Sequence, residues 1–195
     1  MKLLKITLTG LLIIFMFNAI AQTEQGKWLI GGDARLDLSL TTTSYSEYFN
    51  DSKENLNVNF SPKVGYFVLD NLVLGVEVPL AYETIGNPGY GSGKLKTFSM
   101  AGAPFARVYF LSGKVNPFAA LQVGYGFSKS KGAYESNSKL LLYQVGGGFS
   151  AFITDNIAFD VELGYASFKS SPDNNNYVET KVSGLSASLG IAVLL

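Results

Sequence analysis

Large apolar residues alternate with small or polar residues along most of the chain, which is the period-2 pattern of β-strands. The clearest example is the segment 185–195, which has one large apolar face and one face of mostly small residues. Its large apolar face comprises Leu185, Ala187, Leu189, Ile191, Val193 and Leu195. An unpaired strand of this kind would expose a row of free N–H and C=O groups. We therefore expect it to pair with the first strand, which begins near Trp28.

The same alternation recurs in eight segments. They span about 28–40, 56–68, 72–82, 97–110, 118–127, 141–151, 157–166 and 185–195. Each is as long as the roughly 9 to 11 residues with which a tilted strand crosses a bilayer. Proline occurs within or beside these segments at Pro62, Pro79, Pro104 and Pro117. A bulge at any of these prolines would shift the assignment of faces by one residue.

Short and long connections alternate between the eight segments. The short ones are Asp70-Asn71, Ser112-Gly113-Lys114 and Thr154-Asp155-Asn156, whose residue types favour tight turns. The long ones, 41–55, 84–96, 128–138 and 169–178, are polar. An antiparallel membrane barrel sorts its connections in this way, with short turns in the periplasm and long loops outside. The sequence therefore predicts an all-β, eight-stranded antiparallel up-and-down transmembrane β-barrel.

Aromatic residues on the outward faces gather near both ends of the predicted strands. Near the short turns lie Trp28, Tyr66, Phe110, Phe149 and Phe159. Near the long loops lie Tyr82, Phe98, Tyr125, Phe127, Tyr143 and Tyr165. Two such bands are typical of aromatic girdles at the two membrane–water interfaces. The alternative is that these residues form the core of a soluble sandwich or lipocalin-like barrel.

Composition and the N-terminal segment favour an exported membrane protein. The chain is 47% hydrophobic but only 15% charged, whereas about a quarter of the residues of a soluble domain are charged. Residues 1–21 combine Lys2 and Lys5, an apolar run and the small-residue site Ala19-Ile20-Ala21, which predicts a secretory signal peptide before a barrel domain over 22–195. The apolar run is short for the alternative, a membrane anchor. Cleavage leaves 13 basic and 15 acidic residues, a balance that gives no indication of nucleic-acid binding.

Charged residues on the inward faces form the main candidate site. They are Asp33, Arg35, Asp37, Lys63, Glu77, Arg107, Asp160 and Glu162. Most of them lie about six to eight positions from a short turn, and hence at similar heights in the barrel. Because buried charges must pair, we expect a salt-bridge network that plugs the lumen. The alternative is a gate, in which Arg107 or Lys63 exchanges carboxylate partners and opens a narrow path for ions or small solutes.

The commonest general base and metal ligand, histidine, is missing. The chain has no histidine and no cysteine, so it lacks the commonest general base and disulfide staples. Asp160 and Glu162 are two positions apart on one strand face, where a salt-bridge role is favoured over acid–base catalysis. Asp33 and Asp37 supply too few oxygens for a hard cation. We expect no catalytic residue, metal site or cofactor.

Tyrosine and phenylalanine in the long loops are the second candidate site. They are Tyr45, Tyr48, Phe49, Tyr90, Tyr134 and Tyr177. The lysines Lys53, Lys129, Lys131 and Lys169 are expected in the same loops. Exposed tyrosines either anchor binding to an extracellular ligand or surface, or pack a loop on itself. Both interpretations remain open at this point.

The chain after residue 21 resembles the small outer-membrane β-barrels typified by the transmembrane domain of outer membrane protein A and by outer membrane protein X. The resemblance runs from the strand over 28–40, through Phe105-Ala106-Arg107-Val108-Tyr109-Phe110, to the C-terminal strand. It implies a monomer in the bacterial outer membrane, with periplasmic termini and extracellular loops. The implied partners are outer-membrane lipid and the barrel-assembly machinery, and the implied role is structural, with loops available for surface interaction.

Overall fold

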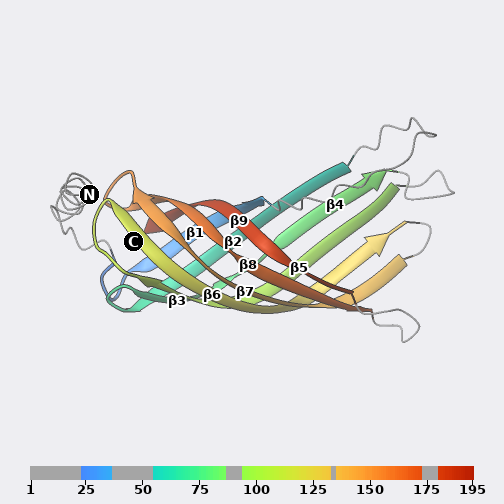
Figure 1. The fold of residues 1–195 in the computed structure, drawn as a ribbon, viewed down its shortest axis with the longest axis horizontal. Coiled ribbons are helices and arrows are strands. Elements are labelled where there is room, and N and C mark those ends of the chain that lie inside the picture. Colours follow the sequence, from blue (N-terminus) through green and yellow to red (C-terminus); the bar gives the residue numbers. More distant parts are fainter. Residues whose placement is uncertain (1–22, 37–54, 87–93, 133–134, 173–179) are drawn as a thin grey trace, which may run out of the picture.

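The computed structural model describes residues 23–36, 55–86, 94–132, 135–172 and 180–195, which form a closed antiparallel β-barrel (Figure 1). The strands are β1 (Trp28–Leu36), β2 (Asn55–Leu69), β3 (Leu72–Glu77), β4 (Leu80–Gly86), β5 (Lys94–Tyr109), β6 (Val115–Lys131), β7 (Glu135–Phe152), β8 (Ile157–Pro172) and β9 (Thr180–Leu194). Apart from β3 and β4, which both lie between β2 and β5, strands that follow one another along the chain lie side by side, and β1 pairs with both β2 and β9. This last pairing closes the ring.

The strand predicted over 72–82 is divided into β3 and β4 at Val78 and Pro79. Proline has no N–H to donate to the ladder, but the hydrogen bonding continues across the break. The Val78 N–H donates to the Pro62 carbonyl over 2.8 Å, and the Ala101 N–H donates to the Pro79 carbonyl over 3.1 Å. β3 and β4 therefore occupy one position in the ring, which confirms the predicted eight-stranded barrel.

None of the four prolines shifts the strand register. The pairing of β2 with β1, of β5 with β6 and of β6 with β7 keeps one register through Pro62, Pro104 and Pro117. β2 also meets β3 and β4 in the same register on either side of Pro79. A shift occurs in β2 between Phe67 and Leu69, next to the turn at Asp70-Asn71. The face assignment made from the sequence therefore holds along the described part of each predicted strand.

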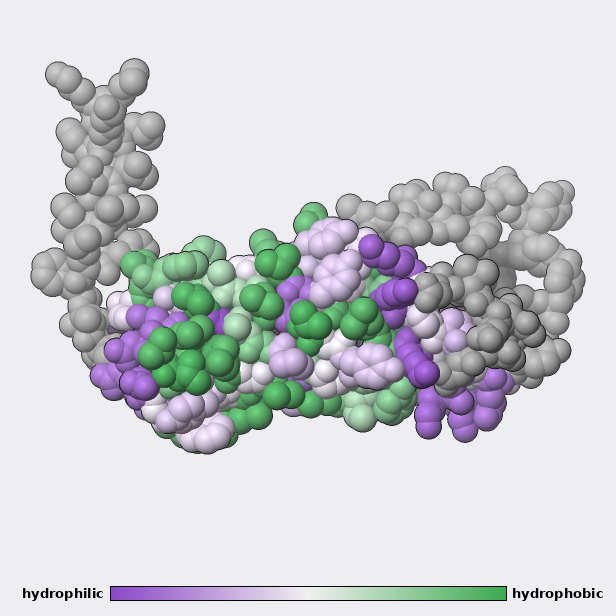
Figure 2. Space-filling view, turned by 90° about the horizontal axis from the view of Figure 1, so that it is seen from below, coloured by the Kyte–Doolittle hydropathy of each residue, from purple (hydrophilic) through white to green (hydrophobic). Residues whose placement is uncertain are grey.

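The large apolar side chains point outward, as the alternation predicts. Of the eleven residues assigned to the two girdles, ten are more than a third exposed, and Phe127 is half-buried against Phe98. Hydrophobic residues cover much of the barrel wall in Figure 2. A soluble barrel would hide such residues, whereas a membrane barrel presents them to lipid. Among the described residues there is no helix of the length and apolarity that membrane crossing requires.

The structure corrects the predicted long connections. β6 continues to Lys131 and β7 starts at Glu135, so most of the loop expected over 128–138 is paired strand. β5 already begins at Lys94 and β8 continues to Pro172, which shortens two more of the predicted loops. Beyond the membrane both faces of a strand meet water, so the ladder continues with polar residues that resemble a loop in composition. The predicted short turns are confirmed, and Asn71 has the positive φ of 65° that a tight turn favours.

The ends of the barrel wall meet where the sequence predicted. Leu29 lies opposite Leu194 in the β1–β9 ladder. The N–H groups of Trp28 and Leu195 each donate to the carbonyl of the other, over 2.8 and 2.9 Å. Leu195 and the short turns lie at one end of the barrel, on the left of Figure 1, and the ends of β4 and β6 and the starts of β5 and β7 lie at the other.

Candidate functional site: the barrel lumen

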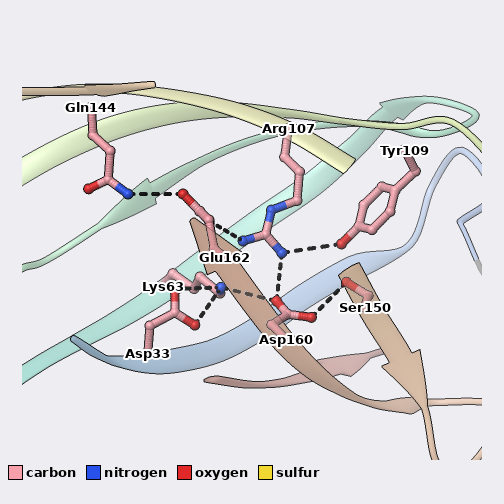
Figure 3. A network of polar contacts seen from close by, with 8 residues as sticks. All are labelled: Asp33, Lys63, Arg107, Tyr109, Gln144, Ser150, Asp160 and Glu162. Carbon is pink, nitrogen blue, oxygen red and sulfur yellow. Dashed lines mark hydrogen bonds and ion pairs between the residues drawn. The ribbon is translucent and has the colours of Figure 1, made fainter. Parts of the chain in front are cut away.

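Two basic and three acidic side chains form one network across the lumen (Figure 3). Lys63 on β2 donates to both carboxylate oxygens of Asp33 on β1, at 2.8 Å each, and to Asp160 on β8 at 3.3 Å. Arg107 on β5 donates to the same oxygen of Asp160 at 2.6 Å and to Glu162 at 3.4 Å. Asp160 is therefore shared between the two cations and joins the pairs into one layer, called here the charged layer.

Neutral side chains add hydrogen bonds to this layer. The Ser150 hydroxyl donates to the other oxygen of Asp160 at 2.6 Å, and the Gln144 amide donates to Glu162 at 2.9 Å. The Tyr109 hydroxyl lies 3.4 Å from the guanidinium and accepts a weaker bond. Both carboxylates thus have a basic and a neutral donor, an arrangement that fixes their orientation.

A glycine makes room for one of the carboxylates. A Cβ atom placed on Gly190 of β9 would lie 1.8 Å from an oxygen of Asp33, far inside van der Waals contact. Asp33 and Gly190 are directly opposite each other in the β1–β9 ladder. The absence of a side chain at position 190 therefore allows Asp33 to turn toward Lys63.

The charged layer is almost completely shielded from solvent. The most exposed of its five charged residues, Glu162, has 8% of its surface exposed, and Asp160 only 2%. An isolated charge in such surroundings is strongly unfavourable, so each one requires the partner that it has. Both Asp160 and Glu162 contact Arg107, the salt-bridge arrangement favoured from their spacing in the sequence.

The structure brings together five of the eight predicted charged residues. These are Asp33, Lys63, Arg107, Asp160 and Glu162. Glu77 is buried opposite Lys63 in the β2–β3 ladder and lines a cavity of about 20 Å³ beside the layer. Arg35 pairs through its backbone with Ser188, but its side chain, like all of Asp37, lies outside the described part of the chain.

An apolar plug fills the lumen between the charged layer and the short turns, and the sequence analysis did not predict it. It comprises Leu29, Phe67, Val73, Phe105, Tyr109, Phe118, Phe152, Ala158, Ala192 and Leu194. Tyr109 packs against both Phe67 and Phe118, with ring centroids 6.0 and 5.8 Å apart. The guanidinium of Arg107 lies 4.0 Å from the centre of the Phe118 ring, so the two layers are in direct contact.

The signal for this plug is present in the sequence. Phe67, Tyr109 and Phe118 occupy inward positions near the short turns, and Phe105 occupies an inward position two residues before Arg107. A barrel interior is expected to be polar where it holds water, so the pattern alone favours a lumen lined by the charged inward residues.

A cavity of about 360 Å³ lies on the other side of the charged layer, toward the long connections. One wall comes from β2, β4 and β5 and their junctions, and it mixes polar with apolar residues: Asn57, Asn59, Ser61, Glu83, Thr97 and Ser99 with Pro79, Leu80, Ala81, Met100 and Ala101. The facing wall is apolar and comes from β7, β8 and β9, with Leu140, Leu142, Phe168 and Val182. The lumen thus consists of a cavity, a charged layer and an apolar plug in succession.

The aromatic loop residues cannot be placed in this picture. Tyr45, Tyr48, Phe49, Tyr90, Tyr134 and Tyr177 all lie outside the described residues. Lys129, Lys131 and Lys169, expected in the same loops, lie instead on β6 and β8. No cluster of potential metal ligands occurs in the described ranges.

Comparisons with known proteins agree with this geometry. Residues 7–190 match the family of outer membrane protein beta-barrel domains. The N-terminal β-barrel domain of OprF from Pseudomonas aeruginosa is 13% identical with a TM-score of 0.50, and the match covers 88% of this chain and 98% of that one. OprG from the same organism is 14% identical with a TM-score of 0.51, covering 89% and 98%. At these identities, the two structures show only that this chain has the same fold as they do. A search of curated proteins finds no match.

Proposed function

The chain belongs to the family of outer membrane protein beta-barrel domains, and from this premise we propose that it is an outer-membrane barrel with a sealed lumen. Its role in this proposal is structural, with the long connections available for contact with an extracellular ligand or surface. The observation that carries the proposal is the filling of the lumen by two successive layers of opposite chemistry, the charged layer and the apolar plug.

Each layer opposes the passage of ions by a different mechanism. The cavity beside the charged layer has a volume of about 20 Å³, which is room for a single water molecule. An ion that passed this point would then meet the side chains of Phe67, Phe105 and Phe118, which offer it no polar contact. An eight-stranded barrel has an interior that its own side chains can fill, so a sealed lumen is compatible with the strand number.

Single-channel recording tests the sealed lumen. The chain from residue 22 onward is refolded in detergent, its folding is verified by a heat-sensitive gel shift, and it is inserted into a planar bilayer at two salt concentrations. We expect no conductance steps from folded protein. Discrete steps that grow with salt concentration would contradict the proposal.

The second candidate function is a narrow channel gated by the charged layer. It is favoured by the cavity of about 360 Å³, which leads toward the layer from the loop end, and by the sharing of Asp160 between Lys63 and Arg107. Exchange of partners there would rearrange the layer without leaving an unpaired charge. Arg107→Ala separates the two candidates. If the charged layer is a gate, the variant should show conductance steps. If the plug still closes the lumen, the variant should show none.

A double variant locates the seal. If the plug is the second barrier, Phe118→Ala combined with Arg107→Ala should conduct while Arg107→Ala alone does not. Phe118→Ala alone is the matched control, because it leaves the salt bridges of Arg107 in place. If the folded double variant shows no conductance steps, Phe118 is not part of the seal.

The proposed orientation places the short turns and termini in the periplasm and the longer connections outside. The proposal also includes export by a signal peptide over 1–21 and insertion by the barrel-assembly machinery. Because the chain has no cysteine, thiol labelling of a single introduced cysteine shows on which side of the membrane that position lies. On intact cells we expect an impermeant thiol reagent to label Ser136→Cys at the β6–β7 end but not Ser112→Cys at a short turn. Labelling of Ser112→Cys alone would reverse the orientation.

The proposed surface role concerns the connections that contain the loop tyrosines. Shortening the segments 41–54 and 173–178 should leave the gel shift unchanged, because the closed ring of paired strands is made by the described residues that flank them, β1 to Leu36, β2 from Asn55, β8 to Pro172 and β9 from Thr180. If the loops bind a surface, attachment of cells to it should fall in the shortened variants. Unchanged attachment would indicate that these two loops have no part in it.

A further inference from the structure

The cavity of about 360 Å³ is lined on two opposite sides by side chains of opposite chemistry. In the ring of strands, three strands separate β4 from β8 in either direction, so the two strands face each other across the lumen. Polar side chains form a row around β4, and apolar side chains form a row around β8. We call them the polar row, with Asn57, Glu83 and Thr97, and the apolar row, with Leu142, Phe168 and Val182.

The polar row crosses three neighbouring strands. Glu83 lies directly opposite Asn57 in the β2–β4 ladder and directly opposite Thr97 in the β4–β5 ladder. Thr97 also hydrogen bonds with Ser130 on β6 at 3.0 Å, which extends the polar side by one strand. Glu83 is the one charged residue among the described residues that line the cavity, and no described basic side chain forms an ion pair with it. The polar side therefore presents a carboxylate that no described residue neutralises.

The apolar row is built in the same way on the facing strands. Phe168 lies directly opposite Leu142 in the β7–β8 ladder and directly opposite Val182 in the β8–β9 ladder. Val182 lines the cavity and is nevertheless 61% exposed. Apolar surface in contact with water is unfavourable, and the interior of a barrel is ordinarily polar where it holds water. The apolar row therefore favours an occupant with an apolar group.

A glycine on β6 helps to fix the apolar row in place. Gly124 lies directly opposite Leu142 in the β6–β7 ladder, and a Cβ atom placed on it would lie 2.9 Å from the Leu142 side chain and 2.7 Å from Ala103. The absence of a side chain at position 124 lets Leu142 pack with Ala101 and Ala103 of β5, so that only 3% of Leu142 is exposed. This end of the apolar row is thus formed by packing within the barrel wall, as is typical of small-molecule sites.

The section of the lumen next to the cavity adds to its negative potential. Among the described side chains, four buried carboxylates lie in and beside the charged layer together with two basic groups. They are Asp33, Glu77, Asp160 and Glu162, with Lys63 and Arg107. Charges that are buried are screened by salt much less than exposed ones. A cavity walled by one sign of charge attracts ligands of the other sign, so the ligand expected here is a cation.

We propose that this cavity binds a small amphipathic cation, an amine whose ammonium group lies at Glu83 and whose apolar body lies on the apolar row. The side-chain oxygens of Asn57 and Thr97 are acceptors for further ammonium protons. The cavity volume falls within the roughly 300 to 1,000 Å³ of small-molecule sites. At about 30 Å³ for each water displaced, it admits on the order of a dozen non-hydrogen atoms. The proposal goes beyond the sealed lumen and does not depend on it, because the bound amine does not cross the charged layer.

Ligand-observed saturation-transfer NMR tests the proposal on the refolded chain in phosphatidylcholine nanodiscs, with empty nanodiscs as the blank. Both ends of the barrel are open to solution there, so the result does not depend on the orientation in the cell. The probes are phenethylamine, phenethyl alcohol and phenylpropionate, which share an apolar body and differ in charge. Phenethylamine should bind saturably and most tightly, and phenylpropionate most weakly. The absence of saturable phenethylamine binding, or equal affinity for the amine and the alcohol, would overturn the proposal.

Two substitutions separate the contributions of the two rows. Glu83→Gln should weaken phenethylamine binding by about two- to fivefold, the range expected for an exposed ion pair, and leave phenethyl alcohol unaffected. Val182→Asn should weaken the binding of both ligands alike, by about three- to tenfold, because it removes an apolar contact that they share. If Glu83→Gln weakened the amine and the alcohol equally, the placement of the ammonium group at Glu83 would be wrong.

Each substitution has a matched control. Glu135→Gln removes an exposed carboxylate from the start of β7, away from the cavity, and Ser183→Asn places the same amide on the outer face of β9, next to Val182 in the chain. Both controls should bind the three probes as the unchanged protein does. A loss equal to that of Glu83→Gln or Val182→Asn in its control would overturn the assignment of that row. Each variant is first verified by the gel shift, and failure of the sealed lumen is detected separately, as conductance steps.

Discussion

The charged layer and the apolar plug fill adjoining sections of the same lumen by opposite means. In the charged layer every contact is directional, and Asp160 alone receives three donors, from Lys63, Arg107 and Ser150. In the plug the contacts are between rings and aliphatic groups with no required partner atom. A directional network loses much of its stability when one member is removed, whereas an apolar cluster loses stability in proportion to the volume removed. The two layers should therefore respond differently to single substitutions.

The largest effect is expected from Arg107→Ala in the charged layer. It leaves Glu162 without its cation and Asp160 with Lys63 alone, so the free energy of unfolding should fall by about 3 to 5 kcal/mol. Urea unfolding in lipid vesicles measures this change through the fluorescence of Trp28, the sole tryptophan, which is 51% exposed on the outer wall. Lys114→Ala, on an exposed turn, is the control. A loss below about 1 kcal/mol would mean that water enters and screens the layer.

A smaller effect is expected when a methyl group is added beside the charged layer. Gly190→Ala places a Cβ within the space of the Asp33 carboxylate and pushes it away from Lys63. Overpacking of this kind lowers the free energy of unfolding by about 1 to 3 kcal/mol. Gly184→Ala on the same strand is a suitable control, because no atom lies within 4 Å of the place that its Cβ would occupy. Equal unfolding midpoints for the two variants would contradict the tight fit at Asp33.

The plug should tolerate a comparable change with less loss. Phe67→Leu removes part of a fully buried ring but keeps an apolar side chain, so a loss below about 1.5 kcal/mol is expected. The same urea experiment measures it. A loss as large as that of Arg107→Ala would show that the Phe67–Tyr109 stacking is as specific as a salt bridge, and the contrast between the two layers would fail.

The smallest effect is expected from an ion pair outside the lumen. Glu135→Gln removes the pair with Lys131, whose atoms are 3.4 Å apart but whose side chains are both more than 70% exposed. In neutral lipid the free energy of unfolding should change by less than about 1 kcal/mol. Comparison with Arg107→Ala then separates the effect of burial from that of charge. A loss of several kcal/mol would contradict this separation.

The wall of the barrel could be predicted because lipid and lumen impose opposite chemistry on alternate residues. Trp28, Tyr125 and Leu163 face outward and Arg107 and Asp160 face inward, as the alternation indicated. The rule does not apply where both faces meet water. For that reason Ser128, Lys131 and Ser138 resembled loop residues although they are paired in the β6–β7 ladder.

The lumen could be predicted only in part. Charged residues on inward faces have few ways to be buried, so Lys63, Arg107 and Asp160 were identifiable as network members from their positions. The neutral partner Ser150 was not, because it meets Asp160 only through the register of β7 against β8. The plug was also missed, since inward aromatic residues have no required partner and give no pairing constraint.

The contact between β1 and β9 determines when the wall of this barrel can become complete. Leu29 lies opposite Leu194, so the first and last strands meet only after every strand between them has been placed. Until then β1 and β9 both present an open edge of unpaired backbone groups, which lipid cannot satisfy. Such a non-local contact is formed slowly, because a long segment of chain must be ordered before it is made. The closing ladder is therefore expected to set the rate of insertion, and a substitution that weakens it should delay assembly more than it destabilises the finished barrel.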